Sequence, residues 1–204
     1  MSGAMVQISC TLGSFAVTGG LWSLARRAAN ARGLALGTTP YLGLFLVTVT
    51  EVALARPIAS DALAIATVCV AAWCDARTGY IFDPVVLCGL GMVGAAACIS
   101  GDLAVTLGGA IVTGGTLLAL RALTGARGLG LGDVKLAAVI GAGIGPAYGS
   151  VALGAAFLCG AAVGLARIAL GRARLRDAVR FGPYLAAGTL MVLAYHRLNT
   201  GVIR

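Results

Sequence analysis

The sequence predicts an all-α fold, a polytopic bundle of about eight transmembrane helices, with six to eight as the range. Hydrophobic residues make up 59% of the 204 positions and charged residues only 11%, whereas a soluble domain has roughly 25% charged residues. The apolar residues form long runs, and a membrane-spanning helix needs about 20 such residues in succession. Short clusters of basic residues separate the runs, as is usual in membrane proteins. We therefore expect an integral membrane protein embedded in the lipid bilayer.

The candidate spans are the runs 4–22, 34–55, 58–74, 84–100, 103–121, 134–148, 149–168 and 182–196. The first run is weakened as a span by Gln7. No basic residues precede it, so we expect a retained anchor and not a secretory signal. The sixth run is short for a crossing unless its glycine-rich flanks extend it. All runs are assigned to one domain, 1–204, in which residues 1–70 supply N-terminal spans and residues 71–204 contain the polar segments described below.

Basic residues divide unequally between the two sets of alternating loops. Twelve lie in one set, namely Arg26, Arg27, Arg32, Arg77, Arg121, Arg127, Lys135, Arg167, Arg172, Arg174, Arg176 and Arg180; three lie in the other, namely Arg56, Arg197 and Arg204. Cytoplasmic loops have the excess of Lys and Arg. The first set is therefore expected in the cytoplasm, with both chain termini outside.

The composition also argues against several classes of partner and cofactor. The net charge of +8 does not indicate nucleic-acid binding, because membrane topology explains the basic clusters and aromatic residues make up only 6%. The cysteines lie in or beside apolar runs: Cys10, Cys69, Cys74, Cys88, Cys98 and Cys159. None forms a CxxC pair, and His196 is the single histidine. We expect no zinc site, no disulfide framework and no cofactor.

Structural roles suffice for most of the seven acidic residues. These roles are helix capping for Asp61, Asp83 and Asp102, an isolated polar contact for Glu51 and ion pairing with arginines for Asp177. Asp75 and Asp133 differ, because both fall at the predicted cytoplasmic ends of spans. Either one alone could have a local role, since Asp75 could end a span and Asp133 could cap the helix that begins at Val134. Ionisable residues within the membrane indicate function, and the natural partner of each is the other.

Two carboxylates that face each other across a small wet cavity can hydrolyse a peptide bond. Like charges in close contact do not both ionise readily, so the pair shares one proton. The ionised member then activates water and the protonated member donates to the substrate. Gly128, Gly130 and Gly132 precede Asp133, and residues without side chains would let a substrate strand approach the backbone.

Three segments in order resemble those of the type IV prepilin leader peptidases. "GLGLGDVKLAAVIGAGIG" is similar to the Gly-x-Gly-Asp segment, which continues as Asp-x-Lys-Leu. "CDARTGYIFDPVVL" resembles the first catalytic segment, and "RFGPYLAAG" the Phe-Gly-Pro segment at the start of the last helix. In the first catalytic segment the family's Ile-Pro-Asn reads Ile81-Phe82-Asp83-Pro84, so the proline is displaced and Asp replaces Asn.

The resemblance implies the architecture of GxGD aspartic proteases, with Asp75 and Asp133 catalytic. It implies site-shaping or substrate-binding roles for Gly130, Gly132, Lys135, Phe181, Gly182 and Pro183, and requires no metal. Lys135 is expected near the pair, where its ammonium would favour one ionised carboxylate. Arg77 is instead expected to be an anchor at the membrane surface.

The function implied is an endopeptidase of the inner membrane that removes the short basic leader from pilin-like or Flp-type precursors at the cytoplasmic face. Full-length family members also have a large cytosolic region between the first two spans, which is linked to N-methylation. Here that region is residues 23–33, so methyl transfer is not expected. Two alternatives remain: a small transporter or channel subunit with intramembrane acids, and an assembly subunit whose catalytic pair has decayed.

Overall fold

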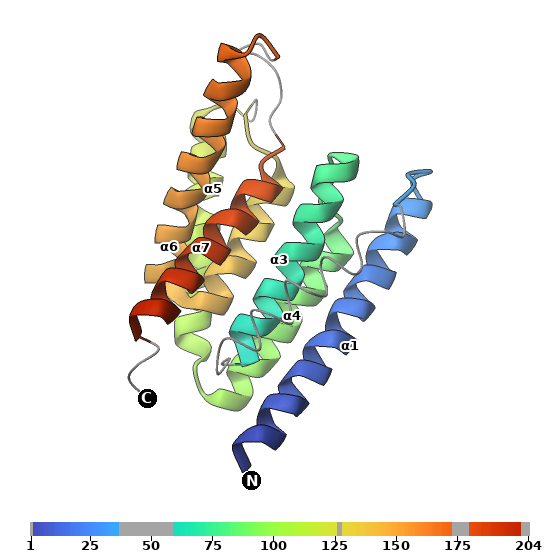
Figure 1. Ribbon diagram of the computed structural model, residues 1–204, viewed down its shortest axis with the longest axis vertical. Helices are drawn as coiled ribbons and strands as arrows, with labels where there is room; N and C mark the ends of the chain where they lie inside the picture. Colours follow the sequence, from blue (N-terminus) through green and yellow to red (C-terminus); the bar gives the residue numbers. More distant parts are fainter. Residues whose placement is uncertain (1, 37–58, 126–127, 173–179, 201–204) are drawn as a thin grey trace.

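The computed structural model describes residues 2–36, 59–125, 128–172 and 180–200, most of which are helical (Figure 1). The helices are α1 (Ser2–Asn30), α3 (Ala59–Thr78), α4 (Asp83–Ser100), α5 (Leu103–Leu123), α6 (Leu131–Ala169) and α7 (Gly182–Thr200). The described part of the chain contains no strand, which confirms the all-α prediction. Most of the predicted span 34–55 lies outside the described residues.

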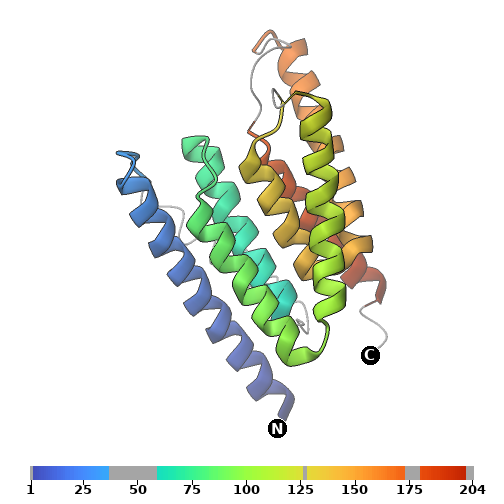
Figure 2. The same cartoon turned by 180° about the vertical axis from the view of Figure 1, so that it is seen from behind.

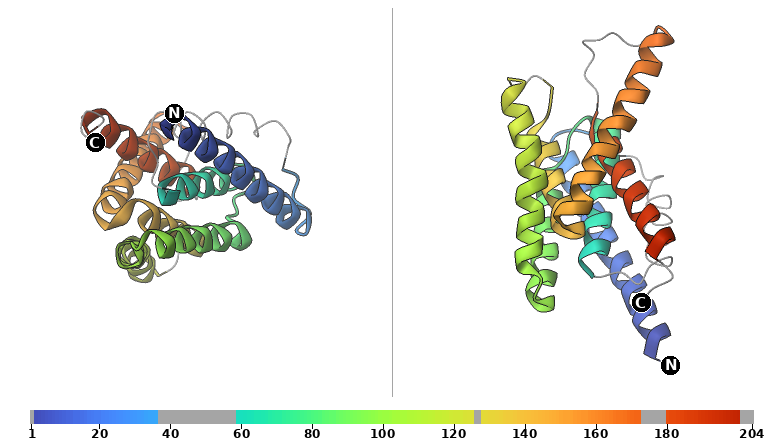
Figure 3. Two further views of the ribbon diagram at one scale, coloured as in Figure 1. Left: turned by 90° about the horizontal axis from the view of Figure 1, so that it is seen from below. Right: turned by 90° about the vertical axis from the view of Figure 1, so that its left-hand side faces the viewer.

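The prediction of eight separate spans is wrong for the described residues, which form six helices. The predicted spans 134–148 and 149–168 both belong to α6, which reverses direction at Gly145 (φ 80°, ψ 170°). The two halves lie side by side, because a Cβ added to Gly149 would lie 3.1 Å from Cα of Gly141 (Figure 3). Glycine tolerates the positive φ, and Pro146 suits the first turn of the helix that follows. No polar loop is needed, so the sequence pattern placed the break between residues 148 and 149 and not at Gly145.

Three of the described helices, α4, α5 and α6, are long and apolar enough to cross a membrane. Their exposed side chains include large aliphatic ones such as Ile99, Ile111 and Leu158. Such a surface suits contact with lipid. Helix α3 is instead surrounded by the bundle, and most of its residues from Ala64 to Cys74 are buried. These helices make the chain a membrane protein.

Glycines allow α5 and α6 to pack backbone against backbone, as the view from behind shows (Figure 2). A Cβ added to Gly109 would lie 1.9 Å from the carbonyl oxygen of Gly141, so a side chain has no space there. Beside this contact, Oγ1 of Thr113 lies 2.7 Å from the carbonyl oxygen of Ala137, to which it donates a hydrogen bond. Small residues serve this purpose in membrane helices. The contact fixes the first half of α6, at whose start Asp133 lies.

One end of the bundle, called the site end below, is where α1, α3 and α5 end and where α4, α6 and α7 begin (Figure 1). Helices α1 and α7 have their other ends, nearest the two chain termini, at the opposite end. The site end contains Arg32 after α1, Arg77 in α3, Arg121 in α5 and Arg180 before α7. The described members of the twelve-residue basic set thus gather at one end, in the grouping that the loops predict.

The predicted helix caps have different outcomes. Asp102 is the N-cap of α5, although its side chain makes no capping hydrogen bond. The N-cap of α4 is Phe82 and not Asp83. The N-cap of α6 is Gly130, and Asp133 contributes to this cap because its side chain accepts the N–H of Gly130. Asp61 lies in the first turn of α3. Glu51 and Asp177 lie outside the described residues.

Candidate active site

Asp75 lies in the last turn of α3 and is 6% exposed. Its Oδ2 accepts a hydrogen bond from the backbone N–H of Gly182, at 2.9 Å. Gly182 is the first residue of α7, and a helix N-terminus is a favourable place for a carboxylate. A Cβ at position 182 would lie 2.8 Å from that same Oδ2. Glycine is therefore required for this contact between α7 and Asp75.

Asp133 lies in the first turn of α6 and is 8% exposed. Its Oδ2 accepts the backbone N–H of Gly130, the N-cap residue, at 3.0 Å. A Cβ on Gly130 would lie 3.1 Å from that oxygen, which is tighter than usual van der Waals contact. Each carboxyl group is thus buried and held by one backbone N–H that a glycine supplies.

The fold brings these two carboxyl groups together, close enough for Asp75 to act electrostatically on Asp133. The segments around them also touch, since a Cβ added to Gly132 would lie 2.8 Å from Cβ of Ile81. This close approach holds the connection between α3 and α4 against the start of α6. All three polar segments of the sequence therefore meet at the site end.

Lys135 lies at the edge of this site and does not point its ammonium at a buried carboxyl. Its Nζ is 2.7 Å from Oδ1 of Asp83, and both side chains are exposed. That Lys135 holds one of the paired carboxylates ionised stays a prediction, and this contact gives its ammonium another partner. Asp83, which stands where the resembling family has Asn, supplies the partner.

The comparison with known families agrees with the site. A model described as the type IV leader peptidase family matches residues 62–165, half of the chain. The chain belongs to this family. The matched range contains Asp75 and Asp133, whereas Phe181, Gly182 and Pro183 lie beyond it. The resemblance seen in the sequence is thereby confirmed.

Two relatives of this chain are named prepilin leader peptidase/N-methyltransferase and come from Burkholderia pseudomallei strains 1026b and K96243. Each is 35% identical to this chain over 128 residues, which are 59% of this chain and 41% of the relative. The chain thus matches about two fifths of the length of these relatives. No solved structure matches it.

The Phe-Gly-Pro segment of this chain fixes where α7 starts. The ring of Phe181 packs on Phe157 of α6, with centroids 4.8 Å apart, and on Tyr184, at 6.5 Å. Pro183 occupies the first turn of α7, where its missing N–H costs no hydrogen bond. Phe181 and Pro183 therefore position Gly182 and thus act on Asp75 indirectly.

Three arginines at the site were assigned by the sequence only to the cytoplasmic face. The guanidinium of Arg180 donates to the carbonyl oxygen of Ala76, and that of Arg121 to Leu129. The guanidinium of Arg32 lies 5.6 Å from the ring centroid of Tyr80 and 5.7 Å from that of Phe82. Each one holds a connecting segment beside the carboxyl pair. The position of Arg180 next to Phe181-Gly182-Pro183 was the one signal available in the sequence.

Asp75 lies outside the three apolar helices, at the end of α3. Burial raises the pKa of its carboxyl group above the ordinary value, while the Gly182 N–H and the charge of Arg180 oppose that rise. Arg77, two residues on, lies 5.1 Å from the ring centroid of Trp73. Among the described residues, no group of three or more His, Cys, Asp or Glu could hold a metal ion.

Proposed function

We propose that this protein is a membrane-embedded aspartic endopeptidase that removes the short leader from pilin-like precursors, with Asp75 and Asp133 as its catalytic residues. The observation that supports it most is the convergence of two buried carboxyl groups from separate helices, each with a glycine N–H. Family membership and the name of the relatives support the substrate class. Methyl transfer is not part of the proposal.

In the proposed reaction the pair holds one proton. The ionised carboxylate takes a proton from water while the water oxygen bonds to the scissile carbonyl carbon. The protonated carboxyl gives its proton to the carbonyl oxygen, which produces a tetrahedral diol. The diol collapses when the newly protonated carboxyl gives its proton to the amide nitrogen, a diol hydroxyl gives its proton to the other carboxylate, and the C–N bond breaks, leaving a new carboxyl group and a free amine. The pair ends with one proton, as it began.

The alternative of a transporter or channel subunit predicts acids near the middle of the membrane. Here Asp75 lies in the last turn of its helix and Asp133 in the first turn of its own. Both carboxyl groups therefore belong to one end of the bundle, which favours a peptidase that receives a precursor from that side.

The direct test is co-expression with a pilin-like precursor that has a short basic leader ahead of its apolar helix. We expect the precursor to gain mobility on a gel, and mass spectrometry of the product to show a new N-terminus after a glycine. A precursor that keeps its leader in the presence of well-expressed, membrane-inserted protein would contradict the proposal.

The site end is proposed to face the cytoplasm, with the protein in the inner membrane. In a variant without native cysteines, an impermeant maleimide added to intact cells should label Ser100→Cys and spare Arg172→Cys. Both positions are exposed and lie at opposite ends of the bundle. Labelling of Arg172→Cys after permeabilisation is the control. The reverse pattern in intact cells would overturn the orientation.

The Lys135–Asp83 pair is expected to contribute little to either stability or cleavage. Exposed ion pairs stabilise a protein by about 0–1 kcal/mol. We therefore expect the free energies of unfolding to differ by no more than this amount among Lys135→Met, Asp83→Asn and the double variant. Thermal unfolding followed by helical circular dichroism measures the coupling between the two positions. The pH profile of cleavage should be unchanged in Lys135→Met. A shifted profile would mean that the ammonium acts on the carboxyl pair after all.

A further inference from the structure

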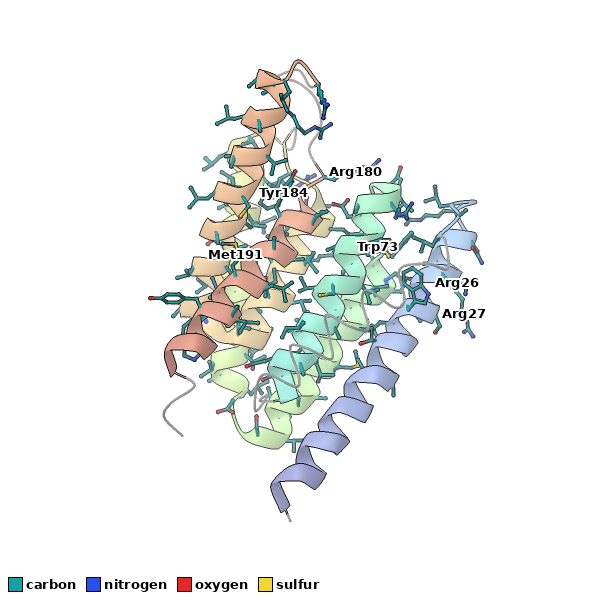
Figure 4. All side chains as sticks on the ribbon, in the orientation of Figure 1. Arg26, Arg27, Trp73, Arg180, Tyr184 and Met191 are labelled. Atoms are coloured by element: carbon teal, nitrogen blue, oxygen red, sulfur yellow. The ribbon has the colours of Figure 1, made fainter. Side chains whose placement is uncertain are left out.

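A cation that the two-carboxylate reaction does not use lies beside Asp75. Arg180 is two residues before Gly182, and its guanidinium donates a hydrogen bond to the carbonyl oxygen of Ala76, the residue after Asp75. Figure 4 shows Arg180 at the start of α7, next to the end of α3. The same segment therefore presents both a backbone N–H and a positive charge to one carboxyl group.

The two carboxyl groups are otherwise alike in their surroundings. Both are buried, and each accepts one backbone N–H at the start of a helix. The charged or titratable groups at the site end of the elements around Asp75 include Cys74, Arg77, Tyr80, Asp83, Arg32, Asp133, Lys135, Arg180 and Tyr184. Arg77 lies over Trp73, Arg32 over Tyr80 and Phe82, and Lys135 is paired with Asp83. The charge of Arg180 favours the ionised form of Asp75.

We propose that Arg180 is a positioning residue that keeps Asp75 the ionised member of the pair, so that Asp75 is the general base and Asp133 the general acid. The proposal rests on the two-carboxylate function given above. An adjacent positive charge favours the ionised form of a carboxyl group, and a guanidinium remains charged at every working pH. A bias of one pKa unit places the shared proton on Asp133 about ten times as often as on Asp75.

The sign of the expected change follows from the need for an ionised base. Burial raises the pKa of Asp75 and the charge of Arg180 lowers it. Without that charge the pKa of Asp75 is higher, so its carboxyl group takes up a proton more readily. The acid limb of the kcat/KM profile should therefore move to higher pH. We expect the acid limb to shift by about one pH unit in Arg180→Gln. This is the low end of the range for a carboxyl group next to an arginine, because Arg180 is exposed.

The experiment uses the full chain in detergent and an N-acetylated peptide with a short basic leader, a glycine and the first turns of an apolar helix. The peptide contains no His, Asp or Glu, so the acid limb reports the enzyme. Gln can still donate to the Ala76 carbonyl, which separates the charge of Arg180 from its hydrogen bond. Arg180→Lys retains the charge and should restore more than half of the shift.

Arg121→Gln is the matched control, because Arg121 also donates to a backbone carbonyl at the site end. Its acid limb should coincide with that of the wild type. If Arg180→Gln only lowers the rate and leaves the limb in place, Arg180 is a structural residue and the proposal is overturned. Cleavage that survives Asp75→Asn overturns the two-carboxylate mechanism as well, which distinguishes the two failures.

Discussion

Asp75→Asn and Asp133→Asn are each expected to lower cleavage of a pilin-like precursor by at least about a thousand-fold. General acid–base catalysis contributes roughly 10²–10⁴-fold per group, and here each carboxyl is proposed to serve a proton transfer that the amide of Asn does not perform. Asn is nearly the same size as Asp and can remain next to the N–H of Gly182 or Gly130. The variants should therefore insert and fold as the wild type does. Precursor processing on gels measures cleavage, and helical circular dichroism measures folding separately.

The double variant should be no slower than either single one, because groups that act as a unit are strongly non-additive. Asp102→Asn is the matched control for the change of chemistry. Asp102 caps α5 at the other end of the bundle without a side-chain hydrogen bond, and Asn is as good a cap as Asp. Asp61→Asn, in the first turn of α3, serves as a second control. Near-normal cleavage by either catalytic variant would remove the two-aspartate mechanism and revive the transporter alternative.

Gly182→Ala is expected to lower cleavage by roughly a hundred-fold while the protein stays folded. The added methyl group would lie 2.8 Å from Oδ2 and 2.9 Å from Cβ of Asp75, so the carboxyl group must turn away. It then loses the hydrogen bond to the Gly182 N–H. A displacement of about 1 Å at a catalytic group costs on the order of 100-fold in rate. The measurement is kcat/KM of the purified variant, with its thermal unfolding temperature alongside.

Two other glycines provide the comparison. An added Cβ at Gly164 meets nothing within 4 Å, so Gly164→Ala should retain activity and stabilise its helix by up to about 1 kcal/mol. An added Cβ at Gly109 would instead collide with the backbone of Gly141, so Gly109→Ala should lower stability and activity together. If Gly182→Ala behaves as Gly164→Ala does, the contact between α7 and Asp75 is not needed for the reaction.

The polar segments could be found in the sequence because Asp75 and Asp133 stand in apolar surroundings beside recognisable glycine motifs. Family membership followed from those motifs and is confirmed. The catalytic roles stay predictions. The partners of the carboxyl groups were harder to foresee, since the hydrogen bond from Gly182 to Asp75 joins residues 107 positions apart. Sequence periodicity indicates which residues are neighbours within a helix. Contacts between residues so far apart in the sequence depend on how the helices pack.

Two features were not foreseen from the sequence. The Lys135–Asp83 pair joins residues 52 positions apart, and motif proximity suggested a nearer carboxylate for the ammonium. The reversal of α6 at Gly145 needs one residue with positive φ and no polar linker, so hydropathy alone places the break at the wrong position. The first feature is a tertiary contact and the second a single backbone torsion, whereas the apolar runs that form α4 and α5 were located to within two residues.

The reversal in α6 has a consequence for the depth of the site. Measured from Gly145, the half that ends at Leu131 is about 21 Å long and the half that ends at Ala169 about 36 Å, at 1.5 Å per residue. A hydrocarbon core of about 30 Å is matched by the longer half and not by the shorter. Most of the short half is buried against other helices, as Leu136, Val139 and Ile140 are, so its missing length falls in the interior of the bundle and not beside lipid. Asp133 stands at the start of the short half, so a precursor would meet it at a depth set by the protein and not by the thickness of the bilayer.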